Sequence, residues 1–136
     1  MEIHYKEGIV FSKEQISDLF LTDNWSSGKY PDKLFRAING SGWLLSAWDN
    51  DNLVGFINCI DDGCMTCFLV FLIVHPNYQG KGIGSALLQK MKEHYKSYNR
   101  IMITTETDNI EFYSKFDFKR NDDDVAMYLK QWGDTK

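Results

Sequence analysis

Residues 74–88 read Val-His-Pro-Asn-Tyr-Gln-Gly-Lys-Gly-Ile-Gly-Ser-Ala-Leu-Leu, and the rest of the chain is organised around this stretch. An apolar run from Cys67 to Val74 leads into it and predicts a buried strand that ends at His75-Pro76. Glycines at positions 80, 82 and 84 allow a tight turn in which several N–H groups converge, and a following helix adds the positive end of its dipole. A strand, a glycine-rich loop and a helix N-terminus in this order are typical of a phosphate-binding site.

Two common phosphate-binding motifs do not fit this stretch. A Walker A loop has Lys-Ser or Lys-Thr after its last glycine, whereas Ser85 and Ala86 follow Gly84. A dinucleotide fingerprint has the spacing G-x-G-x-x-G near the start of a βαβ unit, whereas these glycines run G-x-G-x-G after a predicted antiparallel hairpin. The loop therefore indicates a different class of phosphate-containing ligand.

The composition predicts one globular domain spanning residues 1–136. Hydrophobic residues make up 43% and charged residues 25%, which is ordinary for a soluble protein. The net charge of −4 argues against nucleic acid and anionic membranes as partners, because affinity for phosphate backbones comes mainly from Lys and Arg. No apolar run reaches the roughly 18 residues of a membrane span, and Met1–Val10 lacks the apolar core of a signal peptide. With three cysteines and no even framework, we expect a cytoplasmic protein.

The pattern of apolar residues and turn signals predicts an α/β fold with a central mixed, mostly antiparallel sheet flanked by helices. Ser12 and Gln15 form a capping box at the start of the first helix. Strands are expected at Glu2–Lys6, Gly42–Trp48, Leu53–Ile60, Met65–Val74, Arg100–Thr105 and Val125–Lys130, with extended backbone at Asp117–Lys119. Helices are expected at Lys13–Leu21, from Pro31 to Asn39, at Gly82–Ser97, and from Asp108 or Asn109 through Lys115, with a charged turn at Asn121–Asp124 and a frayed tail at Gly133–Lys136.

The spacing Cys64-x-x-Cys67 raises the question of a metal or redox site. A redox pair usually opens a helix, whereas this pair leads into a strand, where side chains three positions apart point to opposite faces. No second cysteine pair accompanies it, and the histidines show no ligand spacing. We therefore predict no metal site.

Two blocks of the sequence resemble the GNAT superfamily of N-acetyltransferases. Residues 74–88 look like its acetyl-coenzyme A signature, and residues 112–118, Phe-Tyr-Ser-Lys-Phe-Asp-Phe, resemble its F-Y-x-K-x-G-F motif. The blocks lie at the family's usual separation, and the predicted order of elements matches the family through most of the chain. More loosely, residues 46–49 and 53–56 resemble a subgroup akin to arylalkylamine acetyltransferases. The resemblance implies a single-domain GNAT-like fold.

The resemblance also implies that acetyl-coenzyme A binds along the strand–loop–helix unit. Backbone N–H groups from Gly80 to Ser85 would hold its pyrophosphate, while Leu72 and Val74 would pair with its pantetheine arm as with an added strand. The N–H of Val74 would stabilise the oxyanion, and the Tyr113 phenol would protonate the departing thiolate, with core packing as the alternative for its ring. The implied cofactor-binding residues are Leu72, Val74, Gln79, Gly80, Lys81, Gly82, Ile83, Gly84, Ser85, Asn109 and Phe112.

The implied acceptor is a primary amine of a small molecule, and four residues are candidates for binding it. Trp25 and Tyr30 lie in a polar loop after the first predicted helix, and in the family this segment borders the acceptor site. Phe71 lies in a predicted strand, where core packing is the alternative, and Glu106 stands where many members carry asparagine. Aromatic faces, with charge from Asp61 and Asp62, would favour a compact amine with an apolar body.

Other positions depart from the family pattern. Asp117 stands where many members carry glycine, so the turn after the last helix could differ. Some relatives carry a carboxylate at the position of Phe71, where it can act as a general base. The phenyl ring of Phe71 cannot accept a proton, so it cannot take this role. No base stands out among the remaining candidates, which are Glu106, Asp61, Asp62 and His75, and a water chain could serve instead.

Two functions from different classes follow from these observations. The first is an N-acetyltransferase in which the amine attacks acetyl-coenzyme A directly through a tetrahedral intermediate. The second is a catalytically degenerate module that binds or senses acyl-coenzyme A. Retention of Tyr113 and of every loop glycine favours the enzyme. The sequence leaves open whether the protein forms a homodimer, because none of its features decides the oligomeric state.

Overall fold

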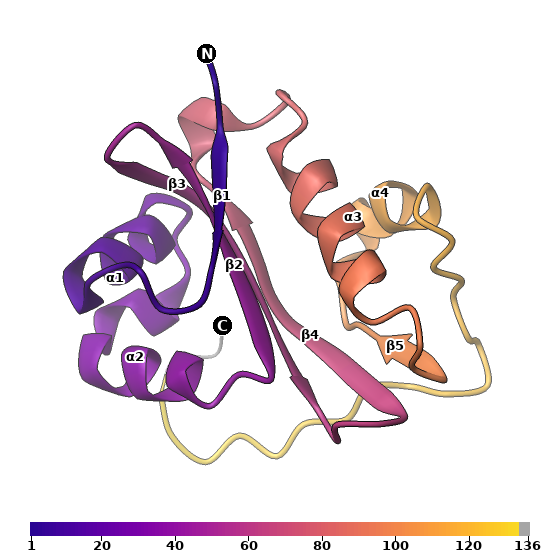
Figure 1. The fold of residues 1–136 in the computed structure, drawn as a ribbon. Helices are drawn as coiled ribbons and strands as arrows, with labels where there is room; N and C mark the ends of the chain where they lie inside the picture. The colour runs from indigo at the N-terminus through magenta and orange to yellow at the C-terminus, as the bar shows by residue number, and fades with distance from the viewer. Residues whose placement is uncertain (134–136) are drawn as a thin grey trace.

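The computed structural model describes residues 1–133, in which the strands form a five-stranded sheet in the order β1-β2-β3-β4-β5 (Figure 1). The first four strands pair antiparallel with their neighbours, and β5 runs parallel to β4. The predicted mixed, mostly antiparallel sheet is therefore confirmed. Its strands are β1 (His4–Glu7), β2 (Trp43–Asp49), β3 (Asn52–Asp61), β4 (Thr66–Val74) and β5 (Arg100–Met102).

Helices cover both faces of the sheet, α1 and α2 on one face and α3 and α4 on the other (Figure 1). The predicted capping box is confirmed at the start of α1. The Ser12 hydroxyl accepts the N–H of Gln15 at 3.0 Å, and the Gln15 side chain accepts the N–H of Ser12 at 2.8 Å. The α-helices are α1 (Lys13–Thr22), α2 (Pro31–Asn39), α3 (Ile83–His94) and α4 (Ile110–Ser114), and the 3-10 helices are η1 (Ser26–Lys29), η2 (Pro76–Tyr78) and η3 (Thr107–Asn109).

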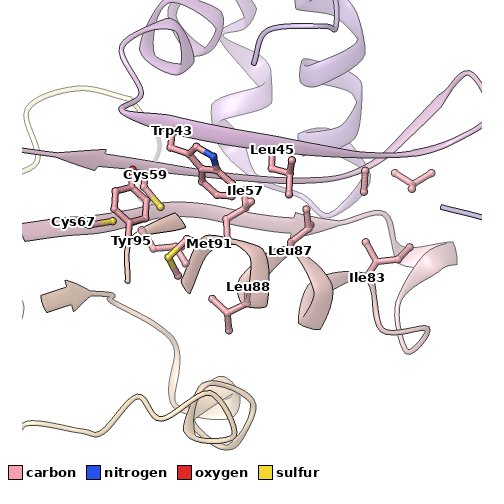
Figure 2. Packing of buried hydrophobic residues seen from close by; sticks show 13 residues of the cluster. Trp43, Leu45, Ile57, Cys59, Cys67, Ile83, Leu87, Leu88, Met91 and Tyr95 are labelled. Atoms are coloured by element: carbon pink, nitrogen blue, oxygen red, sulfur yellow. The ribbon is translucent and has the colours of Figure 1, made fainter. Parts of the chain in front are cut away.

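Each face of the sheet has its own hydrophobic core. On the α3 side, Ile83, Leu87 and Met91 recur at helical spacing and pack on Leu45 and Ile57 of the sheet (Figure 2). On the other side, residues of α1 and α2 pack on Phe56 and Ile73. The division follows from strand geometry, because neighbouring residues such as Phe56 and Ile57 point to opposite faces. Across residues 1–133, none of the helices has the length and apolar character needed to cross a membrane.

A β-bulge in β4 is held in place by the buried side chain of Asn58. The register of β3 and β4 shifts between Asn58 and Cys59, which pair with Phe71 and Leu69 and leave Val70 as the extra residue. The Asn58 Oδ1 atom accepts the Phe71 N–H at 3.1 Å, and its Nδ2 atom donates to the Ser41 hydroxyl at 3.0 Å. The side chain thus replaces a ladder bond that the bulge removes.

Beyond this region β4 and β5 separate. Their pairing covers only Thr66–Phe68 of β4 and Arg100–Met102 of β5, whereas β4 continues to Val74. The helix α3 lies beside the open part of β4 and packs on both β3 and β4. In the described chain, one edge of β4 therefore has no strand partner over its second half.

The predicted strand at Val125–Lys130 is wrong for this structure. Asp117–Lys119 forms no strand either, and Asp117 lies in a turn with a φ of +72° in place of extended backbone. Residues 119–133 form no strand, and Val125 and Leu129 are strongly exposed. A strand needs a partner for its backbone groups, and the chain runs past the edge of β5 without pairing. Several boundaries also shift, most of all at the ends of α3 and β5, which lie at His94 and Met102, short of the predicted Ser97 and Thr105. Of the tail predicted at Gly133–Lys136, residues 134–136 lie outside the described residues.

Replacing Asn58 with alanine should lower the free energy of unfolding by about 2–3 kcal/mol, because a partly buried N–H of the bulge loses its acceptor. Ser41→Ala is the matched control, since it removes only the second partner of the amide and should cost about 1 kcal/mol. Urea denaturation of both variants measures the difference. Equal losses in the two would show that Asn58 does not hold the bulge.

Candidate functional site

The open edge of β4 presents backbone groups away from β3. The His75 N–H donates to the Val54 carbonyl at 2.8 Å, so His75 faces β3. Backbone groups alternate in direction along an antiparallel ladder, and Val74 and Leu72 therefore turn theirs toward the open side. The Val74 carbonyl accepts the Gln79 side-chain amide at 3.0 Å, which ties the loop to the strand end. An extended ligand could hydrogen-bond along this edge as an added strand.

The glycine-rich loop leads from this edge into the N-terminus of α3. Gly80 and Gly82 have φ values of +77° and +85°, a region that side chains other than glycine rarely adopt. A Cβ atom at either position would meet nothing within 4 Å, so the space above the loop is open. No side chain caps α3 at Gly82, and its first-turn N–H groups at Ile83, Gly84 and Ser85 point beyond the helix. This arrangement suits a diphosphate.

The loop is also tied to the sheet by side chains. The Tyr78 hydroxyl donates to Asp49 Oδ2 at 2.6 Å, which fixes η2 against the β2–β3 turn. The ammonium of Lys81 lies 5.8 Å from the centre of the Tyr78 ring and remains exposed. A cation here adds to the attraction for an anion at the helix N-terminus.

A close contact between α3 and β3 sets the position of that N-terminus. A Cβ on Gly55 would lie 3.1 Å from Ile83 and 3.2 Å from both Ala47 and Leu87. These neighbours are fully or almost fully buried, so they have little room to move. The missing side chain therefore lets the first turn of α3 approach the sheet beside the end of β4.

Residues 112–118, the second of the two sequence blocks described above, pack where α3 meets the end of β4. A Cβ on Gly84 would lie 3.7 Å from both Phe112 and Val74, so α4, α3 and β4 meet there. The Tyr113 ring packs between Phe112, at 5.1 Å between ring centres, and Phe118, at 5.8 Å. Burial raises the pKa of the Tyr113 hydroxyl, which keeps it protonated at neutral pH. Asn109 lies where η3 meets α4, and its side chain does not cap α4.

The turn after α4 keeps the conformation that glycine would favour. Asp117 has a φ of +72°, in the left-handed region, and the Phe118 N–H donates to the Tyr113 carbonyl at 3.3 Å. Asp tolerates this region better than most residues, and Lys92 contacts its carboxylate at 3.2 Å. The change from glycine therefore does not unwind the turn that follows Tyr113.

The predicted acceptor residues are only partly brought together. Trp25 packs on Phe71 at 5.5 Å between ring centres, on the α1 side of the sheet, so these two form one aromatic wall. Tyr30 instead packs on Trp132 at 5.5 Å. Glu106 is exposed in the loop before η3. Trp132 was not foreseen, since no local pattern in the sequence indicates that the end of the chain returns to α2.

A hollow of about 320 Å³ lies where the end of the chain meets η1. Serine hydroxyls and two aromatic rings contribute to its walls. It is lined by Ser26, Ser27, Tyr30, Leu129, Lys130, Gln131, Trp132 and Gly133. Tyr30 is thus part of a concave surface, separate from the Trp25–Phe71 wall.

Asp61 and Asp62, expected to supply charge to an acceptor, lie at the opposite end of β4 from the glycine-rich loop. Asp61 pairs with Cys67, roughly 20 Å along β4 from Val74. Its carboxylate accepts the Tyr95 hydroxyl at 2.7 Å. The Asp62 carboxylate accepts three backbone N–H groups of the following turn, which lower its pKa, so both side chains hold the β3–β4 connection. By contrast His75 stays at the end of β4, where its Nδ1 atom accepts the Asn77 N–H.

Comparisons with known proteins agree with this geometry. A sequence model described as the acetyltransferase (GNAT) family matches residues 13–118. An uncharacterized N-acetyltransferase, ycf52, of Pyropia yezoensis is 27% identical over 91% of this chain and 86% of its own. A GNAT family acetyltransferase of Streptococcus pneumoniae superimposes with a TM-score of 0.84 and 28% identity, covering 96% of this chain and 98% of that one. A Staphylococcus aureus protein of unknown function, at 21% identity and a TM-score of 0.86, covers 96% of this chain and all of its own and shares the fold.

Gly55→Ala should lower the free energy of unfolding by about 1–2 kcal/mol, because the new methyl group overlaps three packed neighbours. Gly84→Ala is the control on the other side of the same helix turn. Its methyl group would make only ordinary contacts, and alanine suits a helix better than glycine, so stability should hold or rise by up to about 1 kcal/mol. Thermal melts compare the two. A Gly55→Ala variant as stable as the parent would remove close packing as the reason for this glycine.

Proposed function

The chain belongs to the acetyltransferase (GNAT) family, and from this we propose that it transfers an acetyl group from acetyl-coenzyme A to the primary amine of a small molecule. One observation carries the proposal. The unpartnered edge of β4 leads directly into an open glycine loop and an uncapped helix N-terminus, so a single ligand can bind all three. A long ligand with amide groups in its arm and a diphosphate beyond them has the matching chemistry.

Within this proposal, the backbone of the loop does most of the binding. The N–H groups from Gly80 to Ser85 would hold the pyrophosphate, and Leu72 and Val74 would hydrogen-bond the pantetheine amides. Gln79 would keep the end of β4 in place through the Val74 carbonyl. Lys81, Asn109 and Phe112 would complete the walls of the site. The bound coenzyme supplies the acetyl group as an activated thioester.

Two groups of this chain would act on the thioester. The Val74 N–H would donate to its carbonyl oxygen and stabilise the negative charge that develops there. In the transfer, a C–N bond to the neutral amine would replace the C–S bond of the thioester, the amine nitrogen would lose one proton to solvent, and the sulfur would gain one. The Tyr113 hydroxyl would give its proton to the departing sulfur, and its raised pKa supports the protonated form that this role requires.

The aromatic wall of Trp25 and Phe71 supports an acceptor with an apolar body. Phe71 neighbours Leu72 in β4, so the wall lies on the strand that would bind the thioester, but on its opposite face. Tyr30 and Glu106 remain candidates for binding the acceptor. Three cysteines form no even framework of disulfide pairs, and on that ground a cytoplasmic location is part of the proposal.

Release of free thiol from acetyl-coenzyme A, measured across a panel of primary amines, tests the proposal. Gly82→Glu should abolish release, because it puts a side chain and a negative charge where phosphate must approach the backbone. The fold should survive, since the position opens to solvent. Calorimetry supplies the second readout. Retained coenzyme A binding with no amine turned over would indicate the binding module, and unchanged affinity in Gly82→Glu would exclude the loop.

Tyr113→Phe removes only the hydroxyl and should lower kcat by roughly 100-fold or more, with little change in KM for acetyl-coenzyme A. The hydrogen bond from the Tyr113 hydroxyl to the sulfur becomes strong only as the C–S bond breaks, so the affinity for acetyl-coenzyme A should not change. The ring keeps its contacts with Phe112 and Phe118, and the melting temperature should not move. Steady-state kinetics with an amine found in the panel measures the effect. A wild-type kcat, with chemistry rate-limiting, would leave Tyr113 a packing role only.

A further inference from the structure

A second hollow, of about 460 Å³, lies on the α3 side of the sheet, between the edge strand β1 and α3. Glu7 of β1 is the cross-strand neighbour of Leu45 on β2. Because Leu45 packs toward α3, Glu7 and Tyr5, two residues before it, point to the same face. The pairing of the two strands stops there, so no residue of β1 lies opposite Trp43. The space that this leaves has the size of a small-molecule site.

The floor of the hollow is apolar. Trp43 and Leu45 point from β2 toward α3 (Figure 2), and they are 8% and 4% exposed. The His94 ring, at the end of α3, stacks on the Trp43 indole with 5.1 Å between ring centres and 20° between ring planes. The ring of Tyr5 lines the hollow from β1. An apolar group of a ligand can therefore pack against aromatic rings here.

Two groups of opposite charge lie beside this floor. The Glu7 carboxylate accepts the Trp43 indole N–H at 3.1 Å. The Lys90 ammonium, which comes from α3, lies 5.1 Å from the centre of the Tyr5 ring. Within residues 1–133, neither this carboxylate nor this ammonium forms an ion pair. A ligand in the hollow therefore meets one unpaired negative charge and one unpaired positive charge.

The strand β1 sets the spacing of these two charges. Glu7 and Tyr5, the residue that Lys90 overlies, are two positions apart in an extended strand, which is about 7 Å. The ammonium and carboxylate of an α-amino acid are attached to one carbon, and with an ion pair of about 2.8 Å on each side they bridge a gap of this order. Glu93, the other carboxylate at the hollow, already pairs with Lys96 at 2.8 Å.

We propose that this hollow binds a free α-amino acid with a large apolar side chain. Its carboxylate pairs with Lys90 and its ammonium with Glu7. Its side chain packs on Trp43 and Leu45. A ligand with only one of the two charges would leave a charged group of the protein without a partner. Lys90 lies about two turns, roughly 10 Å, beyond Ile83 along α3, so the hollow is separate from the proposed coenzyme A site.

NMR titration of the isotope-labelled full chain with L-phenylalanine tests the proposal. The indole N–H signal of Trp43 should shift and saturate with a Kd of about 1 mM or below. The signal of Trp25, on the opposite face of the sheet, should not move. Glycine lacks the apolar side chain and should bind roughly 10-fold more weakly or worse. A Kd for L-phenylalanine above about 10 mM, or a shift of the Trp25 signal in place of that of Trp43, would overturn the proposal.

Two variants test the charged contacts. Glu7→Gln keeps an acceptor for the indole N–H but removes the negative charge, and Lys90→Ala removes the ammonium. Each should weaken the binding of L-phenylalanine roughly 10-fold or more, because a charge-assisted hydrogen bond is lost. Lys92→Ala is the matched control on the same helix. The Lys92 ammonium contacts Asp117, and its loss should leave the affinity for L-phenylalanine unchanged.

Two analogues that each lack one charge assign the contacts to the two ends of the ligand. Glu7→Gln should weaken the binding of phenethylamine but not of 3-phenylpropionate, and Lys90→Ala should have the reverse effect. Both side chains are exposed, and circular dichroism shows whether the variants keep their fold. Wild-type affinity for L-phenylalanine in either variant, or losses that do not follow the charge of the analogue, would contradict the proposal. None of these measurements involves coenzyme A, so their outcome is independent of acetyl transfer.

Discussion

The separation of β4 from β5 is the constraint on which the rest of the structure depends. Backbone N–H and C=O groups need partners, and a strand edge left open inside a fold is unfavourable unless water or a ligand satisfies it. In this chain the two strands pair only near the start of β4, so Leu72 and Val74 face an open side. The bulge at Val70 belongs to the same arrangement, because it changes the course of β4 just before these residues. Asn58 accepts the N–H that the bulge leaves unpaired and so allows the bulge inside a packed sheet.

Missing side chains are as important around this edge as those present. Gly55 lets α3 approach the sheet closely, and Gly80 and Gly82 let the loop adopt left-handed backbone. Together they place the positive end of α3 beside the free end of β4. The same residues therefore serve packing and anion binding. A substitution here can alter both, which is why stability and binding must be measured side by side.

The residues proposed to bind the acetyl donor and those proposed to bind the acceptor lie on opposite faces of the sheet. Val74, Phe112 and Tyr113 belong to the α3 side, whereas Trp25 and Phe71 belong to the α1 side. Alternation along β4 sends neighbouring side chains to opposite faces, so one strand can border both a donor and an acceptor. Outside the matched region at 13–118, the chain exposes the apolar side chains of Val125, Met127 and Leu129.

The sequence by itself determined the local elements whose signals lie within a few residues. The capping box at Ser12, the helical spacing from Ile83 to Met91 and the apolar run ending at Val74 all led to the observed elements, because capping and amphipathic periodicity are local properties. The two blocks also identified the family. Only the tertiary structure decided matters that depend on distant partners. Val125–Lys130 has the pattern of a strand yet forms none, since a strand exists only where another edge can bond it. Asp61 and Asp62 carry charge but lie at the far end of β4. Asp61 accepts the Tyr95 hydroxyl and Asp62 accepts N–H groups of a turn, so both stabilise the structure. The ring of Tyr30 packs on that of Trp132. These residues lie far apart in the chain, and no local pattern encodes their contact.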